Sequence, residues 1–178
     1  MAKAIVVNIE KCLACKSCEI ACALAHSKSK VLEEAVAESP RPQRMVTVEA
    51  AAEFGVPMQC RHCEAPPCVE ICPTGAIQRQ SEEGPIVVDK ELCIGCKLCI
   101  LICPFGVLRI GPEGRAIIKC DMCLERMEKG EDPACVEACP TKALKLVSLE
   151  QETKAKRTEA ARKLAKEVKQ EKGKSKEQ

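Results

Sequence analysis

The sequence is poor in aromatic residues. Its 178 residues include no tryptophan, no tyrosine and two phenylalanines, Phe54 and Phe105. Proteins that bind RNA or single-stranded DNA stack the bases on aromatic side chains, so we do not expect a nucleic-acid partner. When the cysteines are set aside, the apolar share of the chain is also low for a globular domain. Something other than the burial of apolar side chains has to stabilise this fold.

The sequence also lacks a long apolar run. The longest, residues 99–108, spans about ten residues and includes Pro104, whereas a membrane-spanning helix needs about 20. The opening MAKAIVV has no apolar segment, twin arginine or cleavage site typical of an export signal. We therefore expect a cytoplasmic protein without a transmembrane segment, and peripheral association with a membrane stays open.

Motifs of catalysis are missing as well. There is no glycine-rich nucleotide-binding motif, no nucleophile beside a base, and only two histidines, His26 and His62. We therefore predict a protein that is not an enzyme and has no substrate site of its own. For each histidine, packing or a backbone hydrogen bond is favoured over a part in proton-coupled reduction.

Cysteine, in contrast, is abundant, and the sixteen cysteines form four groups of four. Groups one and three have the spacing C-x2-C-x2-C-x3-C, while the second gap is four residues in group two and eleven in group four. Because the cytoplasm is reducing, metal ligation explains so many cysteines better than disulfides do. The groups are Cys12, Cys15, Cys18 and Cys22; Cys60, Cys63, Cys68 and Cys72; Cys93, Cys96, Cys99 and Cys103; and Cys120, Cys123, Cys135 and Cys139.

This spacing is typical of iron-sulfur proteins. In the run C-x2-C-x2-C-x3-C-P, three thiolates bind one [4Fe-4S] cluster and the fourth binds the other cluster of a pair. Pro73, Pro104 and Pro140 follow groups two, three and four, whereas Ala23 follows group one. Zinc sites usually combine two separated C-x2-C pairs, so a structural zinc protein is a remote alternative. We predict four [4Fe-4S] clusters with all sixteen cysteines as iron ligands.

The distances along the chain predict how the groups pair. Twenty residues separate Cys72 from Cys93, the usual spacing of a compact two-cluster ferredoxin, so groups two and three are expected to form one module. Groups one and four then form the other, and pairing of group one with group two is the main alternative. The predicted ligand sets are Cys12, Cys15, Cys18 and Cys139 for cluster 1; Cys120, Cys123, Cys135 and Cys22 for cluster 2; Cys60, Cys63, Cys68 and Cys103 for cluster 3; and Cys93, Cys96, Cys99 and Cys72 for cluster 4.

Short runs of β-branched residues between the groups predict short strands. They lie at residues 5–8, 45–48, 86–89 and 116–118, and the turn sequence GPEG predicts a hairpin between 107–110 and 116–118. We therefore predict an α+β fold, with two interleaved modules of the bacterial two-cluster ferredoxin type and short β-hairpins. Within a domain of residues 1–147, module A comprises 1–52 and 111–147, and module B comprises 53–110.

The last segment, residues 148–178, differs from the rest. It is rich in Lys, Glu, Ala and Gln, and Glu-Lys pairs recur at the i,i+4 spacing that stabilises helices. Ala161, Leu164 and Val168 form only a narrow apolar stripe. We predict a charged, solvated helix or a disordered tail, with docking on a partner or an anionic surface as the alternative.

The cysteine-rich segments resemble a known family. The stretches CRHCEAPPCVEICPTGAI, CIGCKLCILICPFGVL and KCDMCLERMEKGEDPACVEACPTKAL are similar to the four-cluster ferredoxin subunits of molybdopterin oxidoreductases, hydrogenases and carbon monoxide dehydrogenases. The resemblance covers residues 3–147. It implies an electron-transfer subunit in which group one pairs with group four and group two with group three.

The opening KCLACKSCEIACALAHS narrows this resemblance. It looks like the iron-sulfur subunits that serve nickel carbon monoxide dehydrogenase in anaerobic metabolism, and similar openings occur beside tungsten aldehyde oxidoreductases. The resemblance implies carbon monoxide dehydrogenase as the catalytic partner and a hydrogenase or another oxidoreductase as the acceptor. A tungsten or molybdenum pterin oxidoreductase of the aldehyde or formate type is the alternative, and a homo-oligomer stays open.

Overall fold

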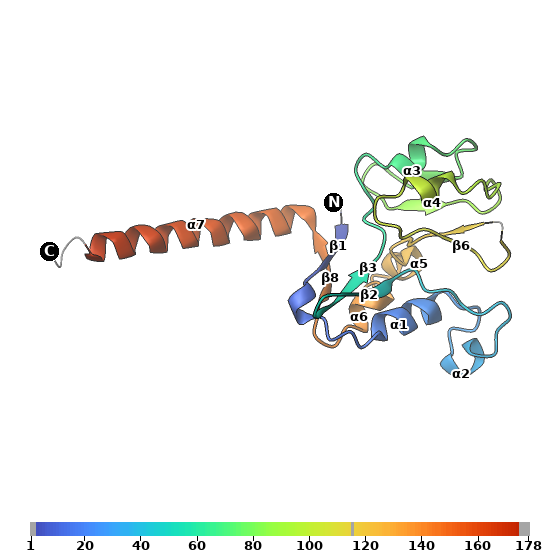
Figure 1. The fold of residues 1–178 in the computed structure, drawn as a ribbon, viewed down its shortest axis with the longest axis horizontal. Helices are drawn as coiled ribbons and strands as arrows, with labels where there is room; N and C mark the ends of the chain where they lie inside the picture. Colours follow the sequence, from blue (N-terminus) through green and yellow to red (C-terminus); the bar gives the residue numbers. More distant parts are fainter. Residues whose placement is uncertain (1–2, 115, 175–178) are drawn as a thin grey trace.

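The strands of this protein pair into separate two-stranded antiparallel sheets. The computed structural model describes residues 3–114 and 116–174, and within them there are four such sheets. The first joins the two ends of the cysteine-rich region, and the other three are hairpins (Figure 1). The pairs are β1 (Lys3–Val7) with β8 (Leu144–Ser148), β2 (Thr47–Ala51) with β3 (Phe54–Met58), β4 (Ile77–Arg79) with β5 (Ile86–Val88), and β6 (Arg109–Ile110) with β7 (Ile117–Ile118).

Four of the short helices carry the third cysteine of a group. They are α1 (Ser17–Ala25), α3 (Pro67–Glu70), α4 (Leu98–Ile102) and α6 (Ala134–Glu137). Helix α1 packs against α6, and α3 packs against α4 (Figure 1). The remaining elements are a 3-10 turn (Ile9–Lys11), α2 (Leu32–Ala35), α5 (Leu124–Glu128) and α7 (Leu149–Lys174). The helix contacts therefore bring group one to group four and group two to group three.

Two small cores lie behind these helix pairs, and cysteines form part of both. The first contains residues from both ends of the cysteine-rich region: Ile5, Cys18, Cys22, Val46, Cys135, Val136, Cys139, Ala143 and Leu144. The second contains Cys68, Ala76, Ile77, Ile86, Cys93, Cys99, Leu108 and Ile117. The division into modules at residues 53 and 110 stays a prediction, since Pro57 lies beside cysteines of group one and Ile117 belongs to the second core.

The predicted strands at 5–8, 86–89 and 116–118 coincide with β1, β5 and β7, and the predicted hairpin is β6–β7. The run at 45–48 overlaps β2, which begins at Thr47. Strand β3 was not predicted, because its Gly55 and Pro57 are residues that normally weaken a strand. Strand β8 was also missed, and its pairing partner β1 lies at the other end of the domain.

Helix α7 follows β8 and extends away from the rest of the molecule (Figure 1). Two of its Glu-Lys pairs form ion pairs at i,i+4 spacing, Glu152–Lys156 and Glu159–Lys163. The side chain of Leu164 is exposed, while Val168 and residues 175–178 lie outside the residues whose surroundings the structure describes. None of the described helices combines the length and the hydropathy that a bilayer crossing requires.

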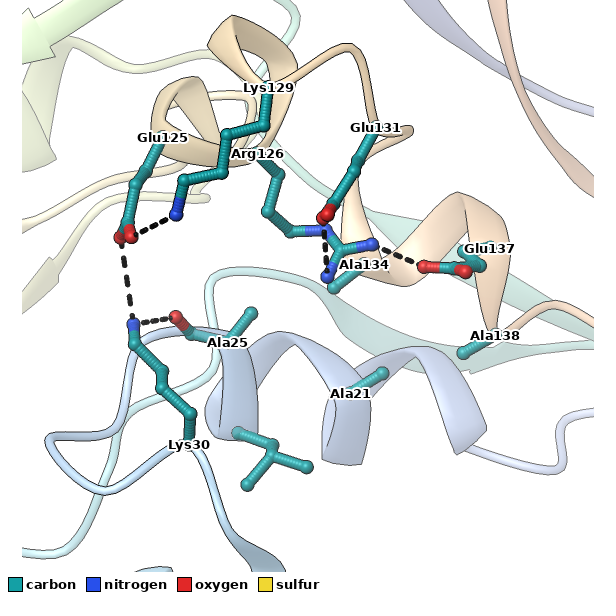
Figure 2. A pocket seen from close by; sticks show the side chains of 11 residues that line it. Ala21, Ala25, Lys30, Glu125, Arg126, Lys129, Glu131, Ala134, Glu137 and Ala138 are labelled. Carbon is teal, nitrogen blue, oxygen red and sulfur yellow. Dashed lines mark hydrogen bonds and ion pairs between the residues drawn. The ribbon is translucent and has the colours of Figure 1, made fainter.

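A groove of about 470 Å³ lies between α1, α5 and α6 (Figure 2). Alanines of α1 and α6 line its floor, and six charged side chains stand at its rim. These pair with one another: Glu125 with Lys30 and Lys129, and Arg126 with Glu131 and Glu137. Exposed pairs of this kind contribute little to stability. They also leave the rim without a net charge that would select an ionic ligand.

Gly55 offers a test of the packing beneath the group one loop. A Cβ atom at this position would lie 2.7 Å from Ala14 Cβ and 3.1 Å from Ala14 Cα. Gly55→Ala is therefore expected to destabilise the cluster-loaded chain by about 1–3 kcal/mol, the usual effect of overpacking. The measurement is the midpoint of thermal unfolding under anaerobic conditions.

The matched control for Gly55→Ala removes the opposing methyl group. Ala14 has a φ of 53°, a conformation that glycine adopts without strain. The double variant Gly55→Ala/Ala14→Gly should therefore recover most of the lost stability. An unchanged midpoint in the single variant, or no recovery in the double variant, would contradict the close contact.

Candidate metal centres

Three cavities of the structure are each lined by four cysteines. In every case three of the cysteines come from one group, and the fourth comes from the group whose helix packs beside it. The sets are Cys12, Cys15, Cys18 and Cys139; Cys60, Cys63, Cys68 and Cys103; and Cys93, Cys96, Cys99 and Cys72. The same sets of residues are predicted from the sequence as ligands of clusters 1, 3 and 4.

The remaining four cysteines, Cys22, Cys120, Cys123 and Cys135, are all buried. Burial raises the pKa of the Cys135 thiol, and the nearby sulfurs of Cys22 and Cys123 raise it further. Burial also raises the pKa of Cys120, with further contributions from Cys22 and Cys135. Because charge on one of these sulfurs affects the others, the four side chains face a common space.

The loops before the helices are shaped by residues in the left-handed conformation. Ala14 and Lys16 have φ values of 53° and 60° in group one, and Gly95 and Lys97 have 71° and 68° at the matching positions of group three. Few residues other than glycine adopt such angles. The repeated reversal turns each loop around a centre, so that three cysteines can point to the same cavity.

Several backbone amides point at the sulfur atoms. The nitrogen of Met45 donates to Cys22 Sγ at 3.2 Å, that of His62 to Cys60 Sγ at 3.4 Å, and that of Met122 to Cys120 Sγ at 3.5 Å. Hydrogen bonds to sulfur stabilise the thiolate, which is the form that binds metal.

Cys72 and Cys139 show this effect on their pKa values. Burial raises the pKa of Cys139, but hydrogen bonds from the backbone of Leu144 and the side chain of Thr141 outweigh it and lower the pKa. For Cys72, burial is likewise outweighed by the backbone of Ile77 and Thr74. The repeated sequence Cys-Pro-Thr at 72–74 and 139–141 is the signal by which these threonines could have been found.

The donor set fits [4Fe-4S] clusters. Such a cluster needs four thiolates around one compact centre, and each of the three cavities offers four thiols. The apolar residues around them, such as Leu108 and Val107 beside Cys103 or Ile77 and Ile117 beside Cys72, exclude water. Because adjacent sets exchange their fourth cysteine, the arrangement also matches paired clusters better than isolated zinc sites.

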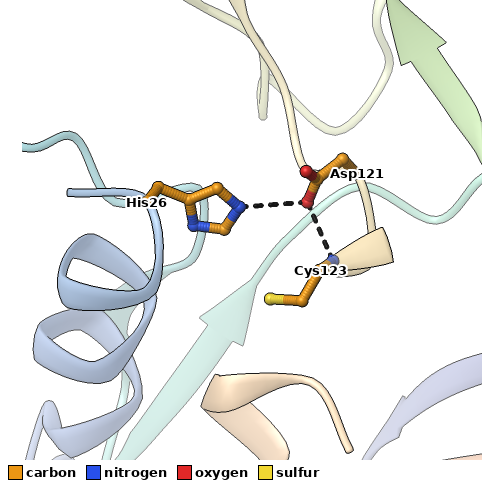
Figure 3. Close-up of side chains that lie close together, drawn as sticks. All are labelled: His26, Asp121 and Cys123. Carbon is orange, nitrogen blue, oxygen red and sulfur yellow. Dashed lines mark hydrogen bonds and ion pairs between the residues drawn. The ribbon is translucent and has the colours of Figure 1, made fainter. Parts of the chain in front are cut away.

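His26 lies beside group four, against Asp121 (Figure 3). Its Nδ1 donates to the carbonyl oxygen of Cys22 at 2.7 Å, and its Nε2 donates to Asp121 Oδ1 at 3.1 Å. Burial lowers the pKa of His26, but the hydrogen bonds to Asp121 and Cys22 raise it to about 11. The backbone hydrogen bond agrees with the interpretation favoured from the sequence. The ion pair was missed because 95 positions separate the two residues.

His62 also makes the backbone hydrogen bond favoured from the sequence. Its Nδ1 accepts a hydrogen bond from the backbone nitrogen of Ile86 at 3.0 Å. Burial lowers the pKa of His62 to about 3, and the positive charge of Lys119 acts in the same direction. This imidazole is therefore neutral at physiological pH.

The exposure of the cysteines differs from one set to the next. Cys15 in the first set and Cys96 in the set around α4 are exposed, whereas all four cysteines around Cys22 are buried. Large apolar residues next to the exposed cysteines are exposed as well, with Leu13 at 69% and Ile94 at 61%. Two of the four centres therefore lie near the surface.

Comparison with known proteins gives a consistent result. Residues 51–149 match the family described as "4Fe-4S dicluster domain", and residues 9–25 match a "4Fe-4S binding domain". An iron-sulfur protein of Rhodospirillum rubrum is 41% identical over 177 residues, which cover 91% of this chain and 90% of that protein.

Two further relatives have names that describe electron transport. The putative electron transport protein YsaA of Escherichia coli is 41% identical, over 84% of this chain and 92% of its own length. The thiosulfate reductase electron transfer subunit PhsB of Salmonella typhi is 36% identical, over 80% and 73%. With its cysteine-lined cavities and these matches, the chain belongs to the family of 4Fe-4S dicluster ferredoxin-type proteins.

Proposed function

We propose that this protein is an electron-transfer subunit that relays electrons through four [4Fe-4S] clusters between a catalytic redox subunit and an acceptor. The observation that carries the proposal is the convergence of four cysteines on each of three cavities, with the other four buried together. The names of relatives support it, since they include electron-transfer subunits of thiosulfate and dimethyl sulfoxide reductases. The bound clusters would supply one-electron redox chemistry.

The proposed ligands are the four sets predicted from the sequence. Cys18 and Cys22 lie about one turn apart on α1, yet the first is assigned to cluster 1 and the second to cluster 2. Cys99 and Cys103 are related in the same way at α4. A single helical turn thus separates ligands of two clusters, which keeps each pair of clusters close enough for direct electron transfer.

The exposure of the cysteines suggests an order for the four clusters. Clusters 1 and 4 include the exposed Cys15 and Cys96, so they suit the ends at which electrons enter and leave. Clusters 2 and 3 then form the middle of the path. The exposed apolar side chains of Leu13 and Ile94 beside the two ends are of the kind that redox partners cover on docking.

The protein's own residues have three tasks in this function. The cysteines hold the iron, the amides of residues such as Met45 and His62 stabilise the sulfur ligands, and the apolar side chains keep water away. These are the means by which proteins tune cluster potentials. None of them requires a substrate site.

A reductase complex is the partner that the named relatives support in general terms. Within that class, the resemblance of the opening sequence favours carbon monoxide dehydrogenase, with a hydrogenase or another oxidoreductase as the acceptor. A tungsten or molybdenum pterin oxidoreductase is the alternative. The cytoplasmic location, peripheral membrane contact, self-association and the part played by the charged segment 148–178 stay predictions.

The ligand exchange can be tested with Cys139→Ser. This variant should disturb the same cluster as Cys15→Ser, because both residues are assigned to cluster 1. The electron paramagnetic resonance spectrum of the reduced chain should lose the same signal in both, and the double variant should lose no further signal. The matched control is Cys103→Ser, which should remove a different signal. If Cys139→Ser and Cys103→Ser affect one and the same signal, the proposed pairing is wrong.

The partner can be identified by the metals of the complex that this chain forms. After anaerobic purification from the native host, iron should be present at about sixteen atoms per chain, with matching acid-labile sulfide. Nickel would indicate carbon monoxide dehydrogenase or a hydrogenase, and tungsten or molybdenum would indicate a pterin oxidoreductase. Iron alone would favour a free electron carrier. A colourless preparation without sulfide would contradict the whole proposal.

A further inference from the structure

Lys119 is a charged residue in an unusual place. It follows β7 directly, and only 5% of its surface is exposed. Lysine is almost never this deeply buried unless its charge is partnered. The Nζ atom of Lys119 donates hydrogen bonds to two carbonyl oxygens, that of Ile86 and that of Cys120, the latter at 2.8 Å. Its partners are therefore neutral dipoles, and no described carboxylate forms an ion pair with it.

The two carbonyl groups belong to the surroundings of two different centres. Ile86 lines the cavity formed by Cys60, Cys63, Cys68 and Cys103, the proposed ligands of cluster 3. Cys120 is a proposed ligand of cluster 2 and is itself buried. The ammonium group of Lys119 thus lies where the surroundings of these two centres meet.

The electrostatic influence of Lys119 reaches group two. Burial and the neighbouring Cys60 raise the pKa of Cys68, and the charge of Lys119 opposes them. The same charge adds to burial in lowering the pKa of His62. Both effects operate across the boundary between residues around cluster 3 and the sequence of group four.

A buried positive charge near an iron-sulfur cluster favours the reduced form. The cluster with its thiolates is an anion and gains one more negative charge on reduction, and charges interact strongly where water is excluded. We propose that Lys119 raises the reduction potentials of clusters 2 and 3 and so supports electron transfer between the two halves of the protein. In this step one electron leaves the reduced cluster of one half and enters the oxidised cluster of the other. No bond forms or breaks, and no proton moves.

This inference rests on the proposed function, because it assumes that the clusters are present. The test therefore begins with the wild-type holoprotein, which must contain about sixteen iron atoms per chain and show reversible reduction. Failure at that stage would reject the electron-transfer function itself. Only a chain that passes this stage tests the effect of Lys119.

The decisive comparison separates the charge of Lys119 from its hydrogen bonds. Lys119→Gln keeps an amide donor for the carbonyl oxygens but has no charge, while Lys119→Arg keeps the charge. In a potentiometric titration followed by electron paramagnetic resonance, Lys119→Gln should lower the midpoint potentials of two of the four clusters. Lys119→Arg should leave all four near their wild-type values. The signals of the affected clusters can be assigned with Cys22→Ser and Cys103→Ser.

Lys97→Gln is the matched control, because Lys97 is also next to a proposed ligand, Cys96, but is exposed to solvent. Water and salt screen its charge, so the potentials should change little. Lys119→Met serves as a second uncharged variant of similar volume. Unchanged potentials in a fully loaded Lys119→Gln or Lys119→Met chain would overturn the proposal. So would equal shifts in Lys119→Arg and Lys119→Gln, or failure of both uncharged variants to assemble four clusters while Lys119→Arg succeeds, which would assign Lys119 a purely structural role.

Discussion

The geometry of one helical turn underlies the rest of this structure. The third and fourth cysteines of each group are four positions apart, so a single turn lies between them, and they face different centres. In group one both are on α1, where Cys18 belongs with Cys12 and Cys15 while Cys22 belongs with Cys120. Each centre is therefore complete only when two groups lie side by side. This requirement explains why α1 packs against α6 and α3 against α4.

The thiol-rich centres also explain how a chain so poor in aromatic residues forms a core. Cysteines contribute to both buried clusters beside a few aliphatic residues such as Ile5, Leu144 and Ile86. The loops that present them contain left-handed residues such as Ala14 and Lys16, which cost free energy in isolation. Metal binding offsets such costs in small proteins of this kind, because the free energy of binding becomes free energy of folding.

Opposing electrostatic effects meet at the sulfur atoms. Burial raises the pKa of thiols such as Cys120, whereas amide and hydroxyl donors lower that of Cys139. Charged groups enter the interior at two places next to group four, the ion pair of His26 with Asp121 and the buried Lys119. Both connect segments that are far apart in the sequence. The interior of this protein is therefore polarised in a defined way around its centres, even though few charged side chains are buried.

The sequence by itself determined the chemistry of the sites, because the spacing of the cysteines is a local property. It predicted the four groups, the short strands β1, β5 and β7, and the β6–β7 hairpin from residues that are neighbours in the chain. It did not predict β8, whose partner β1 lies at the opposite end, nor β3, whose Gly55 fits against Ala14. It also missed Asp121 as the partner of His26 and gave no sign that Lys119 is buried. Those features depend on contacts between distant segments, and only the packing of the tertiary structure decides which side chains lose their water and which charges meet.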